Sequence, residues 1–402
     1  MSQNNKEQKI KDFFKSSAII NEFEEVLSFR PDTLIGIDNV SAEALKEHDI
    51  DTIQDLADLD LVNPPEIRSI PEPILTKWIK IANVLEKLVK EKIKAQKKIL
   101  MIGLDNGGKT SILAVLQDKF SIIKDLLPTR GVQREKLDFF GYPIISWDLG
   151  GQIQYREKMY FAKPELFFGD VDLILYVVDA QDPERFSESA QYFKQILQVL
   201  DDLKEYPPVL IVLHKSDQDI RRTLQWQKNI DSIKNKFSTI LDDYDDKFPI
   251  DFNDTSIFQR ETIMQMFSNA LMTVSETSEI VENILEDFTT QIDGRALSII
   301  SMDGLIFGNY TRNETDESLI NNTALLLQTL SNFHHSLGLI RERQLVLELP
   351  LNGVTIRGEK LFEYSDLQIP VYLWLLSDKP ELLDEKLDYF REQLLPLINL
   401  FI

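Results

Sequence analysis

The chain has 402 residues, a formal net charge of −22 at pH 7 and no cysteine. This length predicts two or three domains, because a single hydrophobic core seldom extends over so many residues. The lack of cysteine excludes disulfides, thiolate metal sites and lipid attachment through cysteine. The negative charge disfavours nonspecific binding to nucleic acid, which requires clustered cations. No apolar run is as long as a membrane span, and the polar first residues lack the core of a secretory signal, so we expect a cytoplasmic protein.

Residues 1–29 carry apolar side chains among lysines and glutamates, which predicts an amphipathic helical extension. Its acidic residues, among them Glu22, Glu24 and Glu25, favour docking on the protein itself over binding to lipid. We therefore expect any membrane association to be weak or to occur through partners.

Residues 30–96 have a helical pattern throughout, which predicts a small all-α domain. Ser41 and Asp51 are expected to cap its first two helices. A longer amphipathic helix is expected after Pro71, with one apolar face made of Ile74, Trp78, Ile81 and Leu85.

In residues 97–276, short apolar strands alternate with helical segments, a pattern that predicts an α/β fold with a mostly parallel sheet and helices on both faces. Two of the strands are almost entirely apolar, as expected for strands that are buried on both sides. The expected strands cover residues 99–102, 143–146, 173–178, 209–213 and 249–252.

Residues 277–402 predict an α+β domain with an antiparallel sheet. Two dipeptides, Asp303-Gly304 and Asn352-Gly353, predict hairpin turns. The expected order is a helix over 280–288, a hairpin over 296–310, a helix over 317–337, strands over 344–349, 354–357 and 371–376, and a helix from Glu381 to the end.

The segment Gly103-Leu-Asp-Asn-Gly-Gly-Lys109-Thr110 fits the phosphate-binding pattern G-x-x-x-x-G-K-[ST] between an expected strand and an expected helix. Glycines allow the backbone N–H groups to point at a phosphate, and the helix N-terminus adds its positive end. Lys109 is expected to reach the β- and γ-phosphates, and Thr110 to ligate Mg²⁺. The expected nucleotide-binding residues of this segment are Asp105, Asn106, Gly107, Gly108, Lys109, Thr110 and Ser111.

A second motif, Trp147-Asp148-Leu-Gly-Gly151-Gln152, follows the expected strand over 143–146. Asp148 is expected to hold a Mg²⁺-bound water, and the Gly151 N–H to meet the γ-phosphate. Gln152 is expected to orient the attacking water.

A third motif, His214-Lys215-Ser-Asp217, ends the apolar strand over 209–213. The Asp217 carboxylate can accept two hydrogen bonds from guanine, whereas adenine would leave a buried charge unpaired. Lys215 is expected to pack over the base and brace the phosphate loop. In a fourth, weaker motif, the backbone N–H groups of Thr255, Ser256 and Ile257 are expected to bond the guanine O6.

These motifs resemble those of Ras-superfamily GTPases, between the Arf-like and the Rag (Gtr) groups. The phosphate loop, the Trp147–Gln152 motif and Pro128-Thr129-Arg-Gly131 look Arf-like, whereas His214-Lys-x-Asp217 and Thr255-Ser-Ile257 are similar to Rag proteins. The resemblance implies that Thr129 senses the γ-phosphate and completes the Mg²⁺ shell, so that Gln152, Lys109 and Thr129 form the catalytic set. It also implies that His214, which replaces the usual asparagine, offers an N–H to guanine N7.

The flanking domains carry two further resemblances. The element order over 277–402 looks like the roadblock (longin-type) domain of Rag proteins, which implies a homo- or heterodimer. Residues 34–53 resemble a helix-hairpin-helix domain, but Asp38 stands where DNA-binding members usually have a second glycine. This aspartate favours protein contact or internal packing over nucleic acid as the role of the module.

The sequence therefore predicts a GTP/GDP-binding switch that depends on Mg²⁺ and hydrolyses GTP slowly, with GTPase-activating and effector proteins as partners. Slow hydrolysis is expected because residues 125–127, just before Thr129, contain no arginine that could act in cis. Two alternatives remain open: a nucleotide-bound scaffold with little hydrolysis, and a DNA-associated P-loop ATPase. Asp217 and the acidic charge disfavour the second of these.

Overall fold

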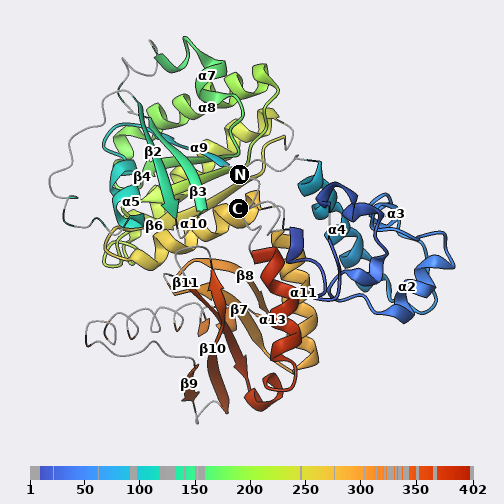
Figure 1. Cartoon of the computed structure of the whole chain (residues 1–402). Coiled ribbons are helices and arrows are strands. Elements are labelled where there is room, and N and C mark those ends of the chain that lie inside the picture. The colour runs from blue at the N-terminus through green and yellow to red at the C-terminus, as the bar shows by residue number, and fades with distance from the viewer. Residues whose placement is uncertain are drawn as a thin grey trace. The chain divides into compact units, whose positions relative to one another are not determined.

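A computed structural model of the chain (Figure 1) separates into two compact units, residues 96–274 and residues 1–95 together with 275–402. Over residues 132–139 and 142–149 the structure describes the backbone, and of the side chains there it describes that of Trp147. The described residues are 10–20, 22–61, 63–90, 97–117, 119, 121, 123, 132–139, 142–149, 152, 159–244, 247–275, 277–302, 304–313, 315–317, 319–320, 323, 330, 333, 337, 344–349, 353–364 and 369–398.

The unit over 96–274 is built on a six-stranded sheet with the order β2-β3-β1-β4-β5-β6. The pair β2–β3 is antiparallel and every other neighbouring pair is parallel, which confirms the predicted mostly parallel sheet. Strand β2 was not among the predicted strands, because its charged composition lacks the apolar run of a buried strand and suits the edge of a sheet. The strands are β1 (Lys97–Gly103), β2 (Val132–Phe139), β3 (Tyr142–Leu149), β4 (Leu173–Asp179), β5 (Val209–His214) and β6 (Ile250–Thr255).

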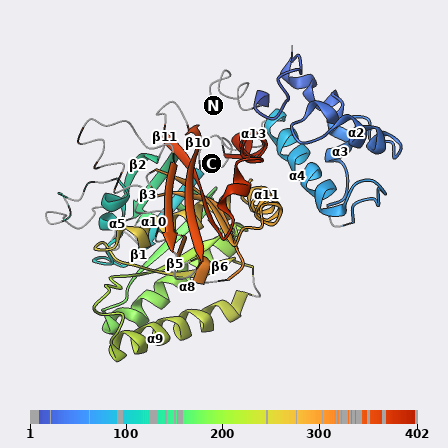
Figure 2. The same cartoon turned by 90° about the horizontal axis from the view of Figure 1, so that it is seen from below.

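Helices cover both faces of this sheet (Figures 1 and 2). Because side chains alternate along a strand, Leu100, Ile174 and Tyr176 join one core with α8 (Phe186–Leu203) and α9 (Leu224–Leu241). The other face carries α5 (Lys109–Leu116) and α10 (Arg260–Val274), which pack against each other. The short helix α7 (Pro164–Phe168) and the 3-10 helices η5 (Pro183–Arg185) and η6 (Asp242–Tyr244) complete this unit.

The C-terminal part of the other unit is a five-stranded antiparallel sheet with the order β8-β7-β11-β10-β9. This confirms the predicted antiparallel sheet with helices. Trp374 is fully buried in its core and lies against Gly358, where an added Cβ would approach the indole to 3.2 Å. The elements are α11 (Ser278–Gln291), β7 (Ala296–Ser301), β8 (Ile306–Thr311), β9 (Gln344–Leu349), β10 (Val354–Tyr364), β11 (Ile369–Ser377), η7 (Pro380–Leu383) and α13 (Leu387–Ile398).

Several details of this domain differ from the sequence prediction. Strand β7 ends at Ser301 and β8 begins at Ile306, so the connection is longer than the two residues predicted; Gly304 within it has φ 93°. The last helix begins at Leu387 rather than Glu381, because the 3-10 turn η7 precedes it. Strand β10 is longer than predicted. Most of the predicted helix over 317–337, with Asp303 and Asn352, lies outside the described residues.

The N-terminal part is helical as predicted, but its caps differ. Asp38, not Ser41, is the N-cap of α2 (Asn39–Lys46), and its carboxylate accepts a hydrogen bond from the Ser41 N–H at 2.7 Å. Thr52, not Asp51, caps α3 (Ile53–Ala57) in a capping box with Asp55. The long helix α4 (Glu72–Val89) buries Leu75, Trp78 and Leu85, whereas the predicted face residue Ile74 is exposed. The 3-10 helix η2 (Pro31–Thr33) precedes α2.

The predicted helix over 1–29 is not continuous in its described part. Residues 12–20 form turns and a bridge from Phe14 to Leu34, and only the 3-10 helix η1 (Phe23–Ser28) follows. Phe13 and Phe14 are buried, so this segment packs on the module itself, as its charges had suggested.

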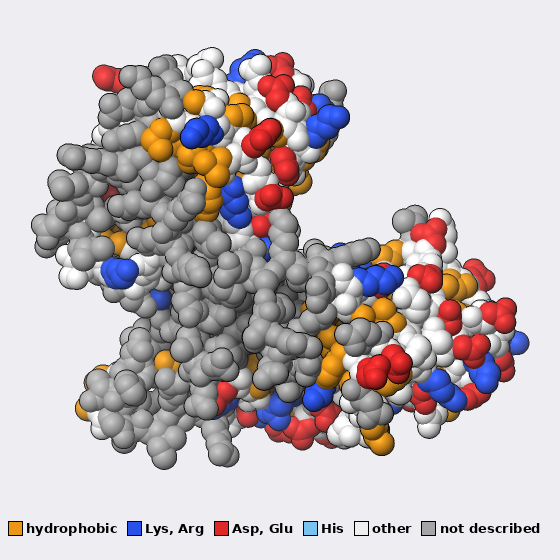
Figure 3. Space-filling model, turned by 45° about the horizontal axis from the view of Figure 1, so that its top comes forward, with side chains coloured by type: hydrophobic (Ala, Val, Ile, Leu, Met, Phe, Trp, Pro, Cys, Tyr) orange, Lys and Arg blue, Asp and Glu red, His pale blue; other side chains and the backbone are white. Residues whose placement is uncertain are grey.

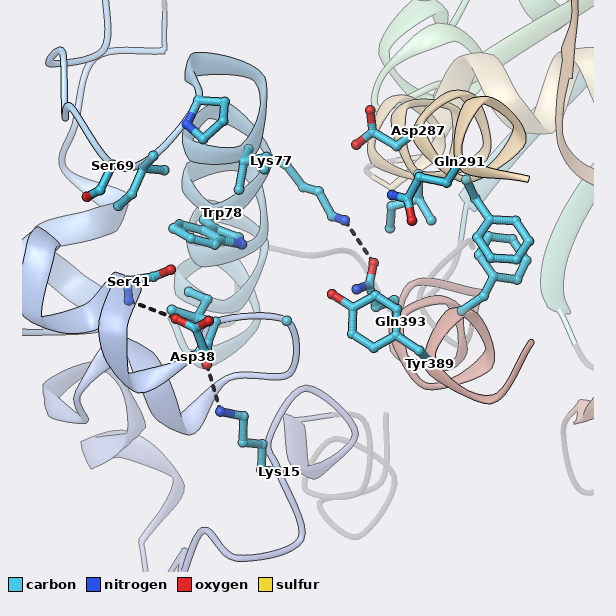
Figure 4. A pocket seen from close by; sticks show the side chains of 18 residues that line it. Lys15, Asp38, Ser41, Ser69, Lys77, Trp78, Asp287, Gln291, Tyr389 and Gln393 are labelled. Carbon is cyan, nitrogen blue, oxygen red and sulfur yellow. Dashed lines mark hydrogen bonds between the residues drawn. The ribbon is translucent and has the colours of Figure 1, made fainter. Parts of the chain in front are cut away.

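The N-terminal module contacts the C-terminal domain through α4, where Figure 4 shows Lys77 pointing at Gln393, and through the turn at Gly36. Lys77 of α4 donates to the side-chain oxygen of Gln393 on α13 at 2.8 Å, and burial lowers the pKa of Lys77. A Cβ added at Gly36 would lie 3.6 Å from the Gln393 amide nitrogen. A cavity of about 460 Å³ remains beside these contacts, lined by Trp78, Asp287 and Tyr389 among others. The turn that resembles a helix-hairpin-helix therefore faces α13.

The surface charge is mixed. On the face shown in Figure 3, the described Asp and Glu side chains are interspersed with Lys and Arg and do not leave one broad basic patch. Within the described part of the chain, no helix combines the length and apolar character that a membrane crossing requires.

Candidate nucleotide-binding site

The four motifs meet at one edge of the parallel sheet, where the carboxyl ends of its strands lie. The phosphate loop follows β1, and Asp148 lies near the end of β3, in register with Met101 of β1. The His214 motif ends β5, and Thr255 ends β6 beside His214. Crevices at this edge of an open α/β sheet are where such folds bind ligands.

Close backbone contacts explain the glycines of the phosphate loop. A Cβ added at Gly103 would lie 2.2 Å from the Val177 carbonyl oxygen, and one at Gly108 would lie 2.3 Å from Cδ2 of His214. Both residues have positive φ, as does Asn106 with φ 59°. The Lys109 side chain is buried, and its Nζ donates to the carbonyl of Leu104 at 2.8 Å and to that of Gly103 at 3.2 Å. The ammonium thus lies inside the loop.

The ring of His214 lies against the phosphate loop at Gly108. Its ring is 2% exposed, and Nδ1 shares a hydrogen bond of 2.9 Å with the Thr255 hydroxyl. Burial, and to a smaller extent the charge of Lys215, lowers the pKa of His214 from 6.5 to about 3. The imidazole is therefore neutral at physiological pH, and its Cδ2–Nε2 edge packs against Gly108. A contact with guanine N7 stays a prediction.

Lys215 is held by an aspartate that the sequence analysis missed. Its Nζ donates to Asp179 at 2.6 Å, and its carbonyl accepts from the Gln181 side chain at 2.6 Å. Lys215 itself has φ 61°, a strained value for a residue with a side chain. Asp179 is the last residue of the apolar strand β4, and Asp148 and Asp217 likewise lie near the carboxyl ends of β3 and β5. This shared position was the sequence signal that could have identified Asp179.

Asp217 is linked to the fourth motif by a short hydrogen bond. The Ser256 hydroxyl donates to the Asp217 carboxylate at 2.5 Å, and the Ser216 N–H donates to the Thr255 carbonyl at 3.0 Å. The Ser256 N–H, predicted to face guanine O6, instead donates to the Thr262 hydroxyl at 3.0 Å. The structure thus brings Asp217 and Ser256 together, and Ile257 lies next to them in the chain.

A second missed residue, Arg185, binds the phosphate loop. Its guanidinium donates to the Asp105 carbonyl at 3.0 Å, to the Asp105 carboxylate at 2.6 Å and to Glu188 at 3.1 Å. Burial alone would lower the pKa of Arg185, but these bonds outweigh it and raise the pKa. Arg185 and Asp105 are 80 positions apart, so no local pattern connects them.

The remaining predicted residues are only partly described. Thr110 and Ser111 lie in the first turn of α5, and Gln152 is half-buried. The Asp148 side chain, Gly151 and Thr129 lie outside the described residues. Thr110 and Asp148 are residue types whose oxygens Mg²⁺ prefers as ligands, so the chemistry of these two residues fits Mg²⁺.

The neutral His214 predicts a pH dependence of stability. Between pH 6.5 and about 3 the unfolded chain binds a proton at this histidine and the folded chain does not, so stability falls as the pH falls. At pH 5 the loss relative to pH 7 should be about 2 kcal/mol. Urea unfolding of the unit over 96–274 at both pH values should show this loss in the wild type, and His214→Asn should remove it.

His48→Gln is the control, because His48 is an exposed histidine of the other unit. An equal pH dependence in the wild type and in His214→Asn would show that the ring is protonated in the folded state.

Comparison with known proteins agrees with this geometry. The family model described as the Gtr1/RagA G protein conserved region matches residues 98–324. ADP-ribosylation factor-like protein 3 of Chlamydomonas reinhardtii is 33% identical over 127 residues, 32% of this chain and 67% of that protein. The ADP-ribosylation factor of Encephalitozoon cuniculi is 29% identical over 144 residues, 36% of this chain and 64% of that protein. The chain thus spans about two thirds of the length of these relatives.

Among solved structures, the Arl6 (BBS3) small GTPase of Trypanosoma brucei with bound GppNp is 19% identical, with a TM-score of 0.36. That match covers 44% of this chain and 97% of the other. The family match covers more than half of the chain and includes the phosphate loop, the Asp148 motif and the His214 motif. The chain therefore belongs to the Gtr1/RagA G protein family, a group of GTP-binding small GTPases.

Proposed function

We propose that the chain is a guanine-nucleotide switch that binds GTP and GDP with Mg²⁺ and hydrolyses GTP slowly. The observation that carries this proposal is a set of contacts that joins the segment proposed to bind the base to the loop proposed to bind the phosphates. Asp217 is bonded to Ser256, and His214, three residues before Asp217, packs against Gly108 of the phosphate loop. One rigid sheet edge therefore presents a carboxylate for a base and a loop for phosphates.

Guanine specificity is proposed for Asp217. Its carboxylate accepts one bond from Ser256 and keeps lone pairs for the N1–H and the exocyclic amine of guanine. Adenine has an acceptor at N1 and no amine at that position, so ATP would leave the carboxylate unpaired. Lys215, with its ammonium fixed on Asp179, offers its alkyl chain to the face of the base.

Phosphate binding is proposed for Lys109 and the loop N–H groups. The ammonium donates to carbonyls of its own loop at 2.8 and 3.2 Å, and a polyphosphate offers stronger, charged acceptors at the same place. Thr110 and Asp148 would hold Mg²⁺, which neutralises charge on the phosphates when bound. Thr129 would join them.

Hydrolysis is proposed to be slow because the chain supplies no free arginine at the loop in its described part. Arg185 is the arginine bonded there, and Asp105 and Glu188 engage it. Gln152 would orient the attacking water, and a partner's arginine would be required for fast turnover. GTPase-activating and effector proteins are therefore the proposed partners, and the cytoplasm the proposed location.

Assembly is proposed to occur through the C-terminal domain, in the manner of a roadblock domain. Strand β9 is the edge of its sheet, and its side chains alternate between exposed and half-buried. Val346 is 46% exposed on this edge. An edge strand offers unpaired N–H and C=O groups to a strand of a second chain. The chain would thus form a homo- or heterodimer.

The proposed switch predicts guanine-only binding and hydrolysis that depends on Gln152. Fluorescent GTP, GDP and ATP analogues with Mg²⁺ should give tight binding of the first two alone. Single-turnover GTP hydrolysis should fall at least tenfold in Gln152→Leu, which cannot orient water, with GTP affinity unchanged. Binding without Gln152-dependent hydrolysis would favour a nucleotide-bound scaffold, and a preference for ATP would reject the assignment.

Asp217→Asn predicts a change of base preference. The asparagine amide donates a bond where the carboxylate accepted one, which suits the 2-carbonyl of xanthine rather than the 2-amine of guanine. GTP affinity should fall by about 10²-fold or more and xanthosine triphosphate affinity should rise. Asp219→Asn, a nearby aspartate outside the motif, serves as the control. Unchanged GTP binding in Asp217→Asn would contradict the assigned base contact.

Val346→Lys predicts loss of assembly, because a lysine on an exposed edge opposes strand pairing. Sedimentation velocity should show the wild type as a dimer and the variant as a monomer at the same concentration. Leu224→Lys replaces an apolar residue of α9 that is even more exposed than Val346 and should not change the sedimentation. A wild type that remains monomeric would exclude the homodimer, and co-expression with a related chain would then test the heterodimer.

A further inference from the structure

The phosphate loop contains a negative charge that works against its ligand. Asp105 is the third residue of the loop, directly before Asn106, and its side chain is 41% exposed. A polyphosphate in this loop would lie beside that carboxylate, and charges of the same sign repel at such distances even near a protein surface. The repulsion grows with the number of phosphate charges.

Other carboxylates lie under the same loop. A small cavity there is lined by Asp105, Asp179 and Asp182, together with Arg185. Asp179 is already paired with Lys215 at 2.6 Å. Among the described residues that line this cavity, Arg185 is the one cation. Arg185 is therefore the cation of this cavity that pairs with Asp105.

The hydrogen bonds of the Arg185 guanidinium orient it toward Asp105. One nitrogen bonds the Asp105 carbonyl at 3.0 Å and another bonds its carboxylate at 2.6 Å, so Arg185 holds both the backbone and the charge of the same residue. The third nitrogen donates to Glu188, which lies outside the loop, at 3.1 Å. Arg185 closes the 3-10 turn η5 at the start of α8, and its side chain is 31% exposed.

We propose that Arg185 is a positioning residue for nucleotide binding, which neutralises Asp105 and fixes the loop backbone so that a di- or triphosphate can enter. This inference rests on the proposed function. The pair is partly exposed, and surface ion pairs add little to folding stability. Its effect is therefore expected in nucleotide affinity rather than in unfolding temperature.

The test compares GTP and GDP affinities of Arg185→Gln, Arg185→Lys, Asp105→Asn and the double variant Arg185→Gln/Asp105→Asn. Arg185→Gln should weaken GTP about tenfold and GDP less, because GTP carries one more negative charge. Asp105→Asn removes the charge that needs neutralising, so the double variant should return to within about threefold of the wild type. Arg185→Lys, which keeps the charge, should lose less than Arg185→Gln.

Two controls separate this role from general support of the fold. Glu188→Gln removes the acidic partner of Arg185 that lies outside the loop and should leave both affinities within about twofold of the wild type. If Arg185→Gln does not fold, Asp105→Asn and Arg185→Lys still decide the question. Equal losses for GTP and GDP that Asp105→Asn does not reverse would overturn the proposal, as would unchanged affinity in Arg185→Gln. A wild type that binds neither nucleotide would instead overturn the proposed function.

Discussion

The nucleotide site depends on one close contact, the approach of Gly108 to the ring of His214. A side chain at position 108 would begin 2.3 Å from that ring, so only a glycine lets the loop rest on the end of β5. The same constraint acts at the start of the loop, where Gly103 crosses the Val177 carbonyl. Because both ends of the loop are fixed on neighbouring strands, its N–H groups are arranged before any ligand arrives.

His214 is neutral because its ring is buried, and the contact with Gly108 is part of that burial. Burial of a charged imidazolium beside Lys215 would carry a large desolvation cost and a repulsion from the lysine charge. The neutral ring instead packs as an aromatic plate and exchanges one hydrogen bond with Thr255, which ties β5 to β6. The histidine of this motif therefore supports the phosphate loop by packing against it. A smaller polar residue at this position would not fill the same space.

The sequence predicts those parts of the site that are each recognised from a short local motif. Gly103–Thr110, Asp148 and Asp217 could be proposed because each lies at or just after the carboxyl end of a strand, and parallel strands bring such ends to one edge. Arg185 was missed because its partner is 80 positions away, and β2 was missed because an edge strand does not need apolar residues. The cap of α2 was misplaced because Asp38 and Ser41 are both good capping residues, and the structure shows the extended backbone of an N-cap at Asp38.

Charge pairing around the loop explains how an acidic protein can present a phosphate site. Three described cations at this edge of the sheet are each paired with a carboxylate: Lys215 with Asp179, Arg185 with Asp105 and Glu188, and Arg221 with Asp254. Lys109 donates to two backbone carbonyls of its own loop. A phosphate can displace a carbonyl from an ammonium more readily than it can displace a carboxylate, since the carbonyl carries no net charge. Under the proposed function, Lys109 and the N-terminus of α5 would supply the attraction for phosphate, while the paired cations would offset the charge of their carboxylates.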